Sequence, residues 1–334
     1  MTRPRKEQFS GCIIGQALGD AAGFVVEGYS TSVCKQYVKN VLTSEKPMQQ
    51  GRSPFSFGQY SDDTQLAREL LQSIVIRLDF DPVDYAQRIA DIFSSDRIVG
   101  RGRATQQAAD RLNRGVPWDQ AGAPSSLAGN GSAMRSAPVG LLFFDNPERM
   151  LQVATDQGRI THQDPRAVAG SIAIAGAVAI ALETPDIKPA DFCGQITEWT
   201  AEISPLFSEQ ITRLPEWVEL PWEKAMPLIA AAGLDPAEGK IWEGISPYVV
   251  SSVLWSLYAF LKTPHNYWDT ICTAIICGGD VDTTAAMAGA VSGAYLGLES
   301  IPKEIARHLN DQGAWTYSDL VNLAERSFDM KLGA

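Results

Sequence analysis

The sequence predicts an all-α protein, folded as one compact multi-helix domain over residues 1–334. Apolar residues recur at helical spacing, as in Leu66, Leu70 and Ile74. Alternating runs typical of strands are scarce, and turn residues lack the spacing of hairpins. No alternation of strands and helices and no fixed-period repeat is present. With 45% apolar and 20% charged residues, the chain can bury a sizeable core.

Each expected helix has a local signal. Residues 62–78 follow Ser61, a residue type that caps helix N-termini. Residues 82–94 begin with Pro82 after Asp81, the usual order at a first helical turn. The apolar run 167–182 is rich in Gly and Ala and too short to span a bilayer, so we expect a buried, closely packed helix. The full set of expected helices is 62–78, 82–94, 165–182, 246–261, 267–277, 283–296, 301–309 and 318–327.

Two long loops and one unusual segment separate these helices. Residues 43–60 and 115–132 are rich in turn residues and lead into helix starts, where functional sites often lie. Residues 199–245 form a Trp- and Pro-rich segment, which we interpret as a variable insertion packed over the core. A structural role for this insertion is favoured over that of a lid. Its tryptophans are Trp199, Trp217, Trp222 and Trp242.

Charge and cysteine content exclude some classes of protein. The net charge of −11 argues against sequence-independent nucleic-acid binding, which requires a basic surface. A phosphate-bearing ligand would therefore be held by backbone N–H groups, a few arginines or metal ions. The five cysteines include no Cys-x-x-Cys pair and lie mostly in apolar stretches, as expected of reduced, buried thiols. Gln16 and Asp20 interrupt any signal-peptide core, so we expect a soluble cytoplasmic protein without a membrane segment.

Two acidic motifs carry the strongest functional signal. Residues 61–64 read Ser-Asp-Asp-Thr, and residues 279–284 read Gly-Asp-Val-Asp-Thr-Thr. Either motif alone is compatible with helix capping. The second motif, however, lies in the least polar part of the chain with no Lys or Arg nearby in sequence, and buried carboxylates need a partner or a cation. Together the motifs predict a site for hard cations with oxygen ligands.

Four further features are weaker on their own. A glycine turn at Gly129–Ser132 could admit an anion to backbone N–H groups, or could be a tight turn only. Residues 100–103 (Gly-Arg-Gly-Arg) form a second such turn, whose arginines could face phosphate or solvent. His162 precedes a buried helix, and three histidines in all make a His-rich zinc site unfavourable. Glu27 follows an apolar run, where a carboxyl group can serve as a general acid or base.

Taken together and in order, these motifs resemble the ADP-ribosylglycohydrolase family. The resemblance spans about residues 9–300 and also includes Gly15, residues 18–21 (Leu-Gly-Asp-Ala), Gly23, residues 133–135 (Ala-Met-Arg) and Thr161. It implies an orthogonal multi-helix bundle of that family's type with two Mg²⁺ or Mn²⁺ ions. The implied metal ligands are Ser61, Asp62, Asp63, Asp280, Asp282 and Thr283.

The resemblance also implies an activity. ADP-ribose would place its distal ribose on the metals, its diphosphate on the Gly129–Ser132 turn and its adenosine near His162. Glu27, Asp62 and Asp282 are the implied catalytic residues, with Glu27 handling the proton; carboxylates nearby would stabilise an oxocarbenium-like transition state. The implied substrate-binding residues are Gly100, Gly102, Gly129, Asn130, Gly131, Ser132, Met134 and His162.

We therefore expect a monomeric, metal-dependent hydrolase that removes ADP-ribose from a modified protein, with arginine as the first linkage to consider. Other linkages remain open, namely serine-linked ADP-ribose, O-acetyl-ADP-ribose or a free nucleotide glycoside. A non-catalytic ADP-ribose-binding or crystallin-like relative is the alternative from another class, but the chain keeps every acidic position. Leu127 and Ala128 replace the polar and aromatic residues usual before the glycine turn, and the segment 199–245 has no family counterpart.

Overall fold

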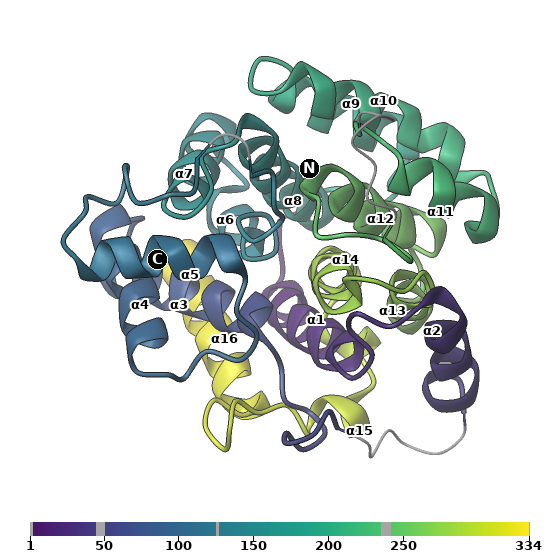
Figure 1. The fold of residues 1–334 in the computed structure, drawn as a ribbon, viewed down its shortest axis with the longest axis horizontal. Coiled ribbons are helices and arrows are strands. Elements are labelled where there is room, and N and C mark those ends of the chain that lie inside the picture. The colour runs from purple at the N-terminus through teal and green to yellow at the C-terminus, as the bar shows by residue number, and fades with distance from the viewer. Residues whose placement is uncertain (1–2, 45–50, 125–126, 235–241, 334) are drawn as a thin grey trace.

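The computed structural model describes residues 3–44, 51–124, 127–234 and 242–333. Within these ranges the chain forms helices joined by turns, and extended pairing is limited to isolated β-bridges (Figure 1). The expected all-α class is confirmed. The helices gather around a central pair, α1 and α14, which lie side by side near the middle of Figure 1.

The α-helices, in chain order, are α1 (Lys6–Phe24), α2 (Thr31–Tyr37), α3 (Asp62–Arg77), α4 (Pro82–Ser94), α5 (Arg103–Asn113), α6 (Ala137–Phe143), α7 (Pro147–Arg159), α8 (Pro165–Glu183), α9 (Pro189–Thr200), α10 (Pro205–Val218), α11 (Trp222–Ala230), α12 (Val249–Lys262), α13 (Tyr267–Ile276), α14 (Val281–Leu296), α15 (Lys303–Ala306) and α16 (Tyr317–Leu332). A π-helical turn, η1 (Val38–Leu42), follows α2, and a 3₁₀ turn, η2 (Leu298–Ser300), follows α14.

The sequence located about half of the helices, and the accuracy of their bounds varied. The expected helix 82–94 coincides with α4, and 62–78 differs from α3 by one residue. The expectation for 301–309 was too long, because α15 covers only Lys303–Ala306, and 318–327 was too short, because α16 continues to Leu332. The helices α1, α2, α5, α6, α7, α9, α10 and α11 were not expected.

The contact between α1 and α14 sets the geometry of the whole fold. Gly11, Gly15 and Gly19 lie four residues apart on one face of α1 and touch the backbone of α14. A β-carbon at Gly15 would stand 2.3 Å from the Gly289 carbonyl oxygen, and one at Gly19 would stand 2.1 Å from that of Ala285. Only small residues permit backbones to approach so closely.

Because α1 and α14 run in opposite directions, the end of α1 lies beside the start of α14. Gly23 touches the backbone of Val281 and Asp282. The Gly28 N–H donates to the Gly279 carbonyl oxygen at 2.8 Å, and the Gly279 N–H donates to the Tyr29 carbonyl oxygen at 2.9 Å. The acidic residue that follows α1 is thereby brought to the second acidic motif.

The apolar helix α8 is buried, as expected. Its length and composition would allow it to cross a membrane, because it extends beyond the apolar run to Glu183, and the expectation that it is too short does not hold. However, 83% of its most apolar window is buried inside the fold. It packs against α6, α7, α9, α12 and α14. The five cysteines are unpaired and buried, as their surroundings indicated.

The described part of the 199–245 segment consists mainly of helices. It contains α10 and α11, which pack on α9 and α12 at one edge of the molecule (Figure 1). Residues 235–241 of this segment lie outside the described residues, as do residues 45–50 of the first expected loop and 125–126 of the second.

Candidate active site

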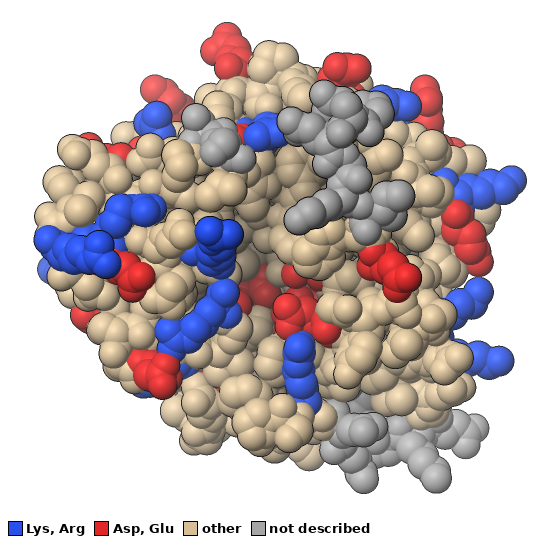
Figure 2. Space-filling model, in the orientation of Figure 1, with Lys and Arg blue, Asp and Glu red and all other residues tan. Residues whose placement is uncertain are grey.

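A cavity of about 240 Å³ collects almost every residue singled out in the sequence. Figure 2 shows a hollow in the middle of one face, with acidic side chains inside and basic ones at its rim. The expected residues that line the cavity are Glu27, Asp62, Asp63, Gly100, Gly102, Gly129, Asn130, Gly131, Met134, His162, Asp280, Asp282 and Thr283. Ser61 and Ser132 are the two that do not line it; both are fully buried.

The first acidic motif begins α3 and is held by hydrogen bonds to Asp20 of α1. Ser61 caps the helix by accepting a hydrogen bond from the Asp63 N–H, and its hydroxyl donates to Asp63 Oδ2 at 2.9 Å. The buried carboxylate of Asp20 accepts from the Ser61 N–H at 2.8 Å and from the Thr64 hydroxyl at 2.6 Å. Sequence reasoning gave Asp20 no role, although an aspartate inside an apolar helix already signalled a buried, bonded group.

The second acidic motif is not a simple cap. Asp280 occupies the N-cap position of α14 but makes no capping hydrogen bond with its side chain. Its carboxylate instead accepts from Asn130 Nδ2 at 2.5 Å, which links this motif to the glycine turn. The Thr283 hydroxyl lies 3.3 Å from Asp63 Oδ2 and 3.5 Å from Asp280 Oδ1, so it bridges the two acidic motifs.

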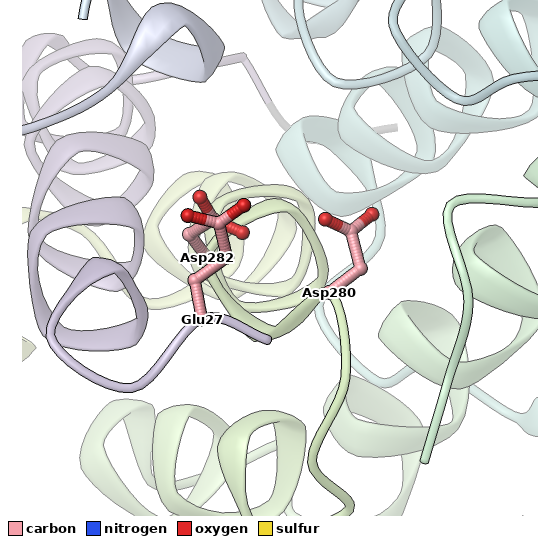
Figure 3. A group of neighbouring side chains, drawn as sticks. All are labelled: Glu27, Asp280 and Asp282. Carbon is pink, nitrogen blue, oxygen red and sulfur yellow. The ribbon is translucent and has the colours of Figure 1, made fainter. Parts of the chain in front are cut away.

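The aspartates of the cavity form no ion pair with a described lysine or arginine. Ligand oxygens of Glu27, Asp280 and Asp282 lie within 4.8 Å of one another (Figure 3). Among the described residues no lysine or arginine forms an ion pair with Asp62, Asp63, Asp280 or Asp282, and Asp63 Oδ1 is buried without a hydrogen-bond partner. These oxygen atoms fit a hard divalent cation.

The pKa values of these aspartates reflect the same lack of a cationic partner. Burial raises the pKa of Asp280 to about 6, although Asn130 counteracts the shift. Burial, together with repulsion from neighbouring carboxylates, raises the pKa of Asp62, Asp63 and Asp282 well above the ordinary range. A bound cation would favour the ionised form of each group.

Glu27 has a partner that the sequence did not reveal. Arg52 Nη1 lies 2.5 Å from Glu27 Oε2 and also donates to the Phe24 carbonyl oxygen at 3.1 Å. The guanidinium group stacks on the Phe24 ring at 5.0 Å. Arg52 belongs to the long loop before α3, so the expectation that this loop contributes to a site agrees with its position.

In the Gly100–Gly102 turn, the backbone of Gly100 can approach Asp62 closely because Gly100 has no side chain. Gly100 has φ +75, and a β-carbon on it would lie 2.6 Å from Asp62 Oδ1. Arg101 and Arg103 both line the cavity and are both exposed, so each faces the cavity mouth as well as solvent. Arg101 forms an ion pair with Asp96.

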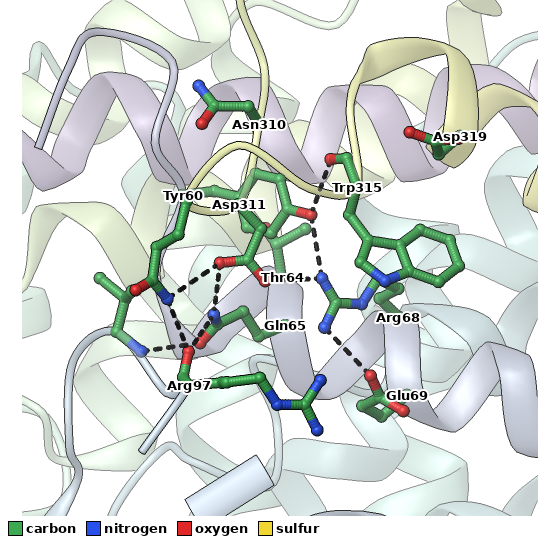
Figure 4. A network of polar contacts seen from close by, with 12 residues as sticks. Tyr60, Thr64, Gln65, Arg68, Glu69, Arg97, Asn310, Asp311, Trp315 and Asp319 are labelled. Atoms are coloured by element: carbon green, nitrogen blue, oxygen red, sulfur yellow. Dashed lines mark hydrogen bonds and ion pairs between the residues drawn. The ribbon is translucent and has the colours of Figure 1, made fainter. Parts of the chain in front are cut away.

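A buried network holds this turn against α3 (Figure 4). Gln65, which directly follows the acidic motif 61–64, accepts from the Val99 N–H at 2.8 Å and donates to the Arg97 carbonyl oxygen at 3.0 Å. Its amide also donates to Asp311 Oδ1 at 2.7 Å, and Asp311 is paired with the buried Arg68 at 2.7 Å. Gln65 therefore fixes the distance between the Gly100 turn and Asp62.

The glycine turn at Gly129 differs from expectation in one respect. Several turn residues follow it, and α6 begins only at Ala137, so no helix N-terminus stands directly behind the turn. The Ser132 hydroxyl donates to the Ala167 carbonyl oxygen, away from the cavity. His162 lies against the turn, where β-carbons on Gly129 and Gly131 would meet its ring at 3.2 Å and 2.8 Å.

Comparison with known proteins identifies the family of this fold and site. A sequence profile described as ADP-ribosylglycohydrolase matches residues 1–333. The chain belongs to the ADP-ribosylglycohydrolase family. A solved structure described as an ADP-ribosylglycohydrolase-related protein complex superposes with a TM-score of 0.74 at 26% identity, covering 98% of this chain and 99% of the other.

Relatives of this ADP-ribosylglycohydrolase span nearly its whole length. An uncharacterised protein of Archaeoglobus fulgidus is 30% identical, covering 86% of this chain and 88% of the relative. The ADP-ribosylhydrolase ARH3 of Xenopus tropicalis is 29% identical, with 88% and 89% coverage. The ADP-ribosylarginine hydrolase Tri1 of Pseudomonas putida is 26% identical, with 97% and 78% coverage. The chain is thus an enzyme of a glycosidase family, and the crystallin-like alternative is not favoured.

Proposed function

We propose that this ADP-ribosylglycohydrolase removes ADP-ribose from a modified protein side chain by hydrolysing the glycosidic bond at the distal ribose. The observation that carries the proposal is the single cavity in which the two acidic motifs, the two glycine turns, Glu27 and His162 converge. Family membership and the names of the relatives support the substrate class.

We propose that two divalent cations, Mg²⁺ or Mn²⁺, complete the site. Asp62, Asp63, Asp280, Asp282 and Thr283 would hold them, and the Ser61 hydroxyl lies behind Asp63 to orient it. When bound, such ions act as a template and Lewis acid for sugar hydroxyls or water. The unpartnered Asp63 Oδ1 and the raised pKa values of the aspartates support this assignment.

The protein groups have separate tasks in the proposed reaction. The glycine turns bind and orient the ligand, since their bare backbones allow close approach. The buried carboxylates stabilise the positive charge that develops at the anomeric carbon. Water adds to this carbon, the bond to the protein side chain breaks, and the leaving group takes up a proton. We propose that Glu27, paired with Arg52, accepts the proton of the water.

We propose two candidates for the linkage between ADP-ribose and the protein side chain that the enzyme cleaves. The sequence expectation was ADP-ribosyl-arginine, and the similarity to Tri1 supports it. The Arg52 guanidinium beside Glu27 favours the second candidate, an O-linked substrate such as ADP-ribosyl-serine, because a cationic leaving group would be repelled there. The several ARH3 relatives show that the family includes hydrolases not named for arginine.

Release of free ADP-ribose from matched arginine-linked and serine-linked protein substrates tests this proposal. We expect release from at least one substrate with added Mg²⁺ and none with a chelator. An Arg52→Ala variant should gain relative activity on the arginine-linked substrate. Absence of release from both, under every metal condition, would contradict the proposed activity.

We also propose that the protein works in the cytoplasm as a monomer, and the five unpaired cysteines support a reducing environment.

A further inference from the structure

The motif around the glycine turn contains an arginine that the proposed function does not yet use. Arg135 is fully buried and directs its donors to four acceptors. Nε donates to Gln157 Oε1 at 2.9 Å, Nη1 to the Gly131 carbonyl oxygen at 3.0 Å, and Nη2 to the Gln157 carbonyl oxygen and to Thr161 Oγ1, both at 2.8 Å. Among the described residues no carboxylate forms an ion pair with it.

The hydrogen bond to Thr161 determines where the Thr161 proton goes. A guanidinium group only donates, so Thr161 Oγ1 must accept from Arg135. The other contact of this hydroxyl is His162 Nδ1 at 2.8 Å. Thr161 is fully buried, and its hydroxyl has no other acceptor among the described residues. A buried hydroxyl proton without an acceptor is costly, so the proton points to Nδ1.

This arrangement fixes the imidazole. If Nδ1 accepts a hydrogen bond, the neutral ring carries its proton on Nε2. Burial and the nearby Arg135 charge lower the pKa of His162 to about 3, so the ring is neutral at physiological pH. His162 is 98% buried, its Nε2 makes no hydrogen bond to a described residue, and the side chain lines the cavity.

We propose that Arg135 and Thr161 form a positioning relay that locks His162 as the Nε2–H tautomer and presents that N–H to a ligand oxygen beside the Gly129–Gly131 turn. Arg135 holds the turn itself through the Gly131 carbonyl oxygen, so one buried cation orders both the backbone and the side-chain donor. The ligand class is an anion or hydroxyl acceptor, and on the proposed function, on which this part rests, it is the diphosphate of ADP-ribose.

The tautomer can be read directly in the ligand-free protein. The chain has three histidines, so long-range ¹H–¹⁵N correlation spectra of the ring nitrogens are simple, and a His162→Gln variant assigns the relevant signals. We expect an unprotonated Nδ1 and a protonated Nε2 in the wild type at neutral pH. Thr161→Ser should keep this pattern, whereas Thr161→Val should give a mixture of tautomers. A protonated Nδ1 in the wild type would overturn the proposal.

ADP-ribose binding then tests whether His162 donates a hydrogen bond to the ligand. Titration of the Mg²⁺-loaded protein with ADP-ribose should shift the Nε2–H signal, and Thr161→Val should weaken binding about tenfold (~1.4 kcal/mol) while Thr161→Ser stays near the wild type. Equal affinity of Thr161→Val and wild type would overturn the donor role. If wild type shows the expected tautomer but binds no ADP-ribose, the relay stands and the proposed function fails.

Discussion

Asp282 and its neighbours are placed where their charges conflict. They begin helices, which favours negative charge, yet they are buried next to one another, which opposes it. Without a cation such a site is destabilising, so an acid-to-amide change should separate function from stability. This behaviour distinguishes a cation site from a set of helix caps, in which removal of the carboxylate weakens the fold.

For Asp282→Asn we therefore expect activity to fall by roughly 100-fold or more, because a ligand of the proposed cation site is lost. The metal-free protein should be at least as stable as wild type, because repulsion between buried carboxylates is relieved. Turnover assays and thermal unfolding with and without Mg²⁺ measure both effects. Asp110→Asn, an exposed change on α5, is the control. Full activity in Asp282→Asn would reject the site.

Gly100→Ala tests how closely the distal turn must approach Asp62. The β-carbon would meet Asp62 Oδ1 at 2.6 Å, so we expect a large loss of activity and a loss of about 1–3 kcal/mol of unfolding free energy. Gly115→Ala is the matched control for Gly100→Ala, because Gly115 has φ +83 and no described residue lies within 4 Å of the added carbon. It should show the backbone cost alone, about 1 kcal/mol, with activity intact. Denaturant unfolding and initial rates measure both variants.

At the scale of elements, the packing of α1 against α14 forms the centre of the fold. Every residue of α1 from Gln8 to Phe24 is buried, so the helix has no solvent-exposed polar face and its sequence has no amphipathic period. The amphipathic α4 was located correctly, whereas α1 was not expected as a helix. Its four-residue glycine spacing is the signal that could have revealed it.

The close contact between α1 and α14 predicts opposite effects on stability when two helical glycines are replaced by alanine. Gly15→Ala should destabilise the protein by about 2 kcal/mol or more, because the new carbon meets the Gly289 backbone and the helices must separate. It should also lower activity, since Glu27 and Asp282 depend on this contact. The added carbon of Gly194→Ala on α9 meets no described residue within 4 Å, so this variant should stabilise the protein by up to about 1 kcal/mol. Urea unfolding compares the two; equal effects would contradict the packing argument.

For the molecule as a whole, the acidic cavity should make stability depend on pH in an unusual direction. The pKa of Asp280 is about 6 in the fold and near 3.8 when unfolded, so the folded state binds more protons between these values. This contribution is present below pH 3.8 and is lost as pH rises through 6. Metal-free wild type should therefore lose on the order of 2 kcal/mol relative to Asp280→Asn between pH 4 and pH 7.

Urea unfolding of both proteins in a chelator, at a series of pH values, measures this difference. Added Mg²⁺ should reverse it for the wild type alone, because a cation at the site favours the ionised carboxylate. A difference that does not change with pH would mean that Asp280 is ionised in the metal-free fold.

The sequence by itself determined the all-α class and the two acidic motifs, because helix signals and clustered carboxylates are local patterns. It indicated most of the other cavity residues through the resemblance of their motifs, taken in order, to a known family. Only the tertiary structure decided the partners of these residues: Asp20 behind Ser61, Arg52 on Glu27, Gln65 on the Gly100 turn and Arg135 behind His162. These contacts join residues that lie 25 to 41 positions apart in the sequence. They depend on how closely glycine-bearing helices pack, which a local pattern of side chains does not record.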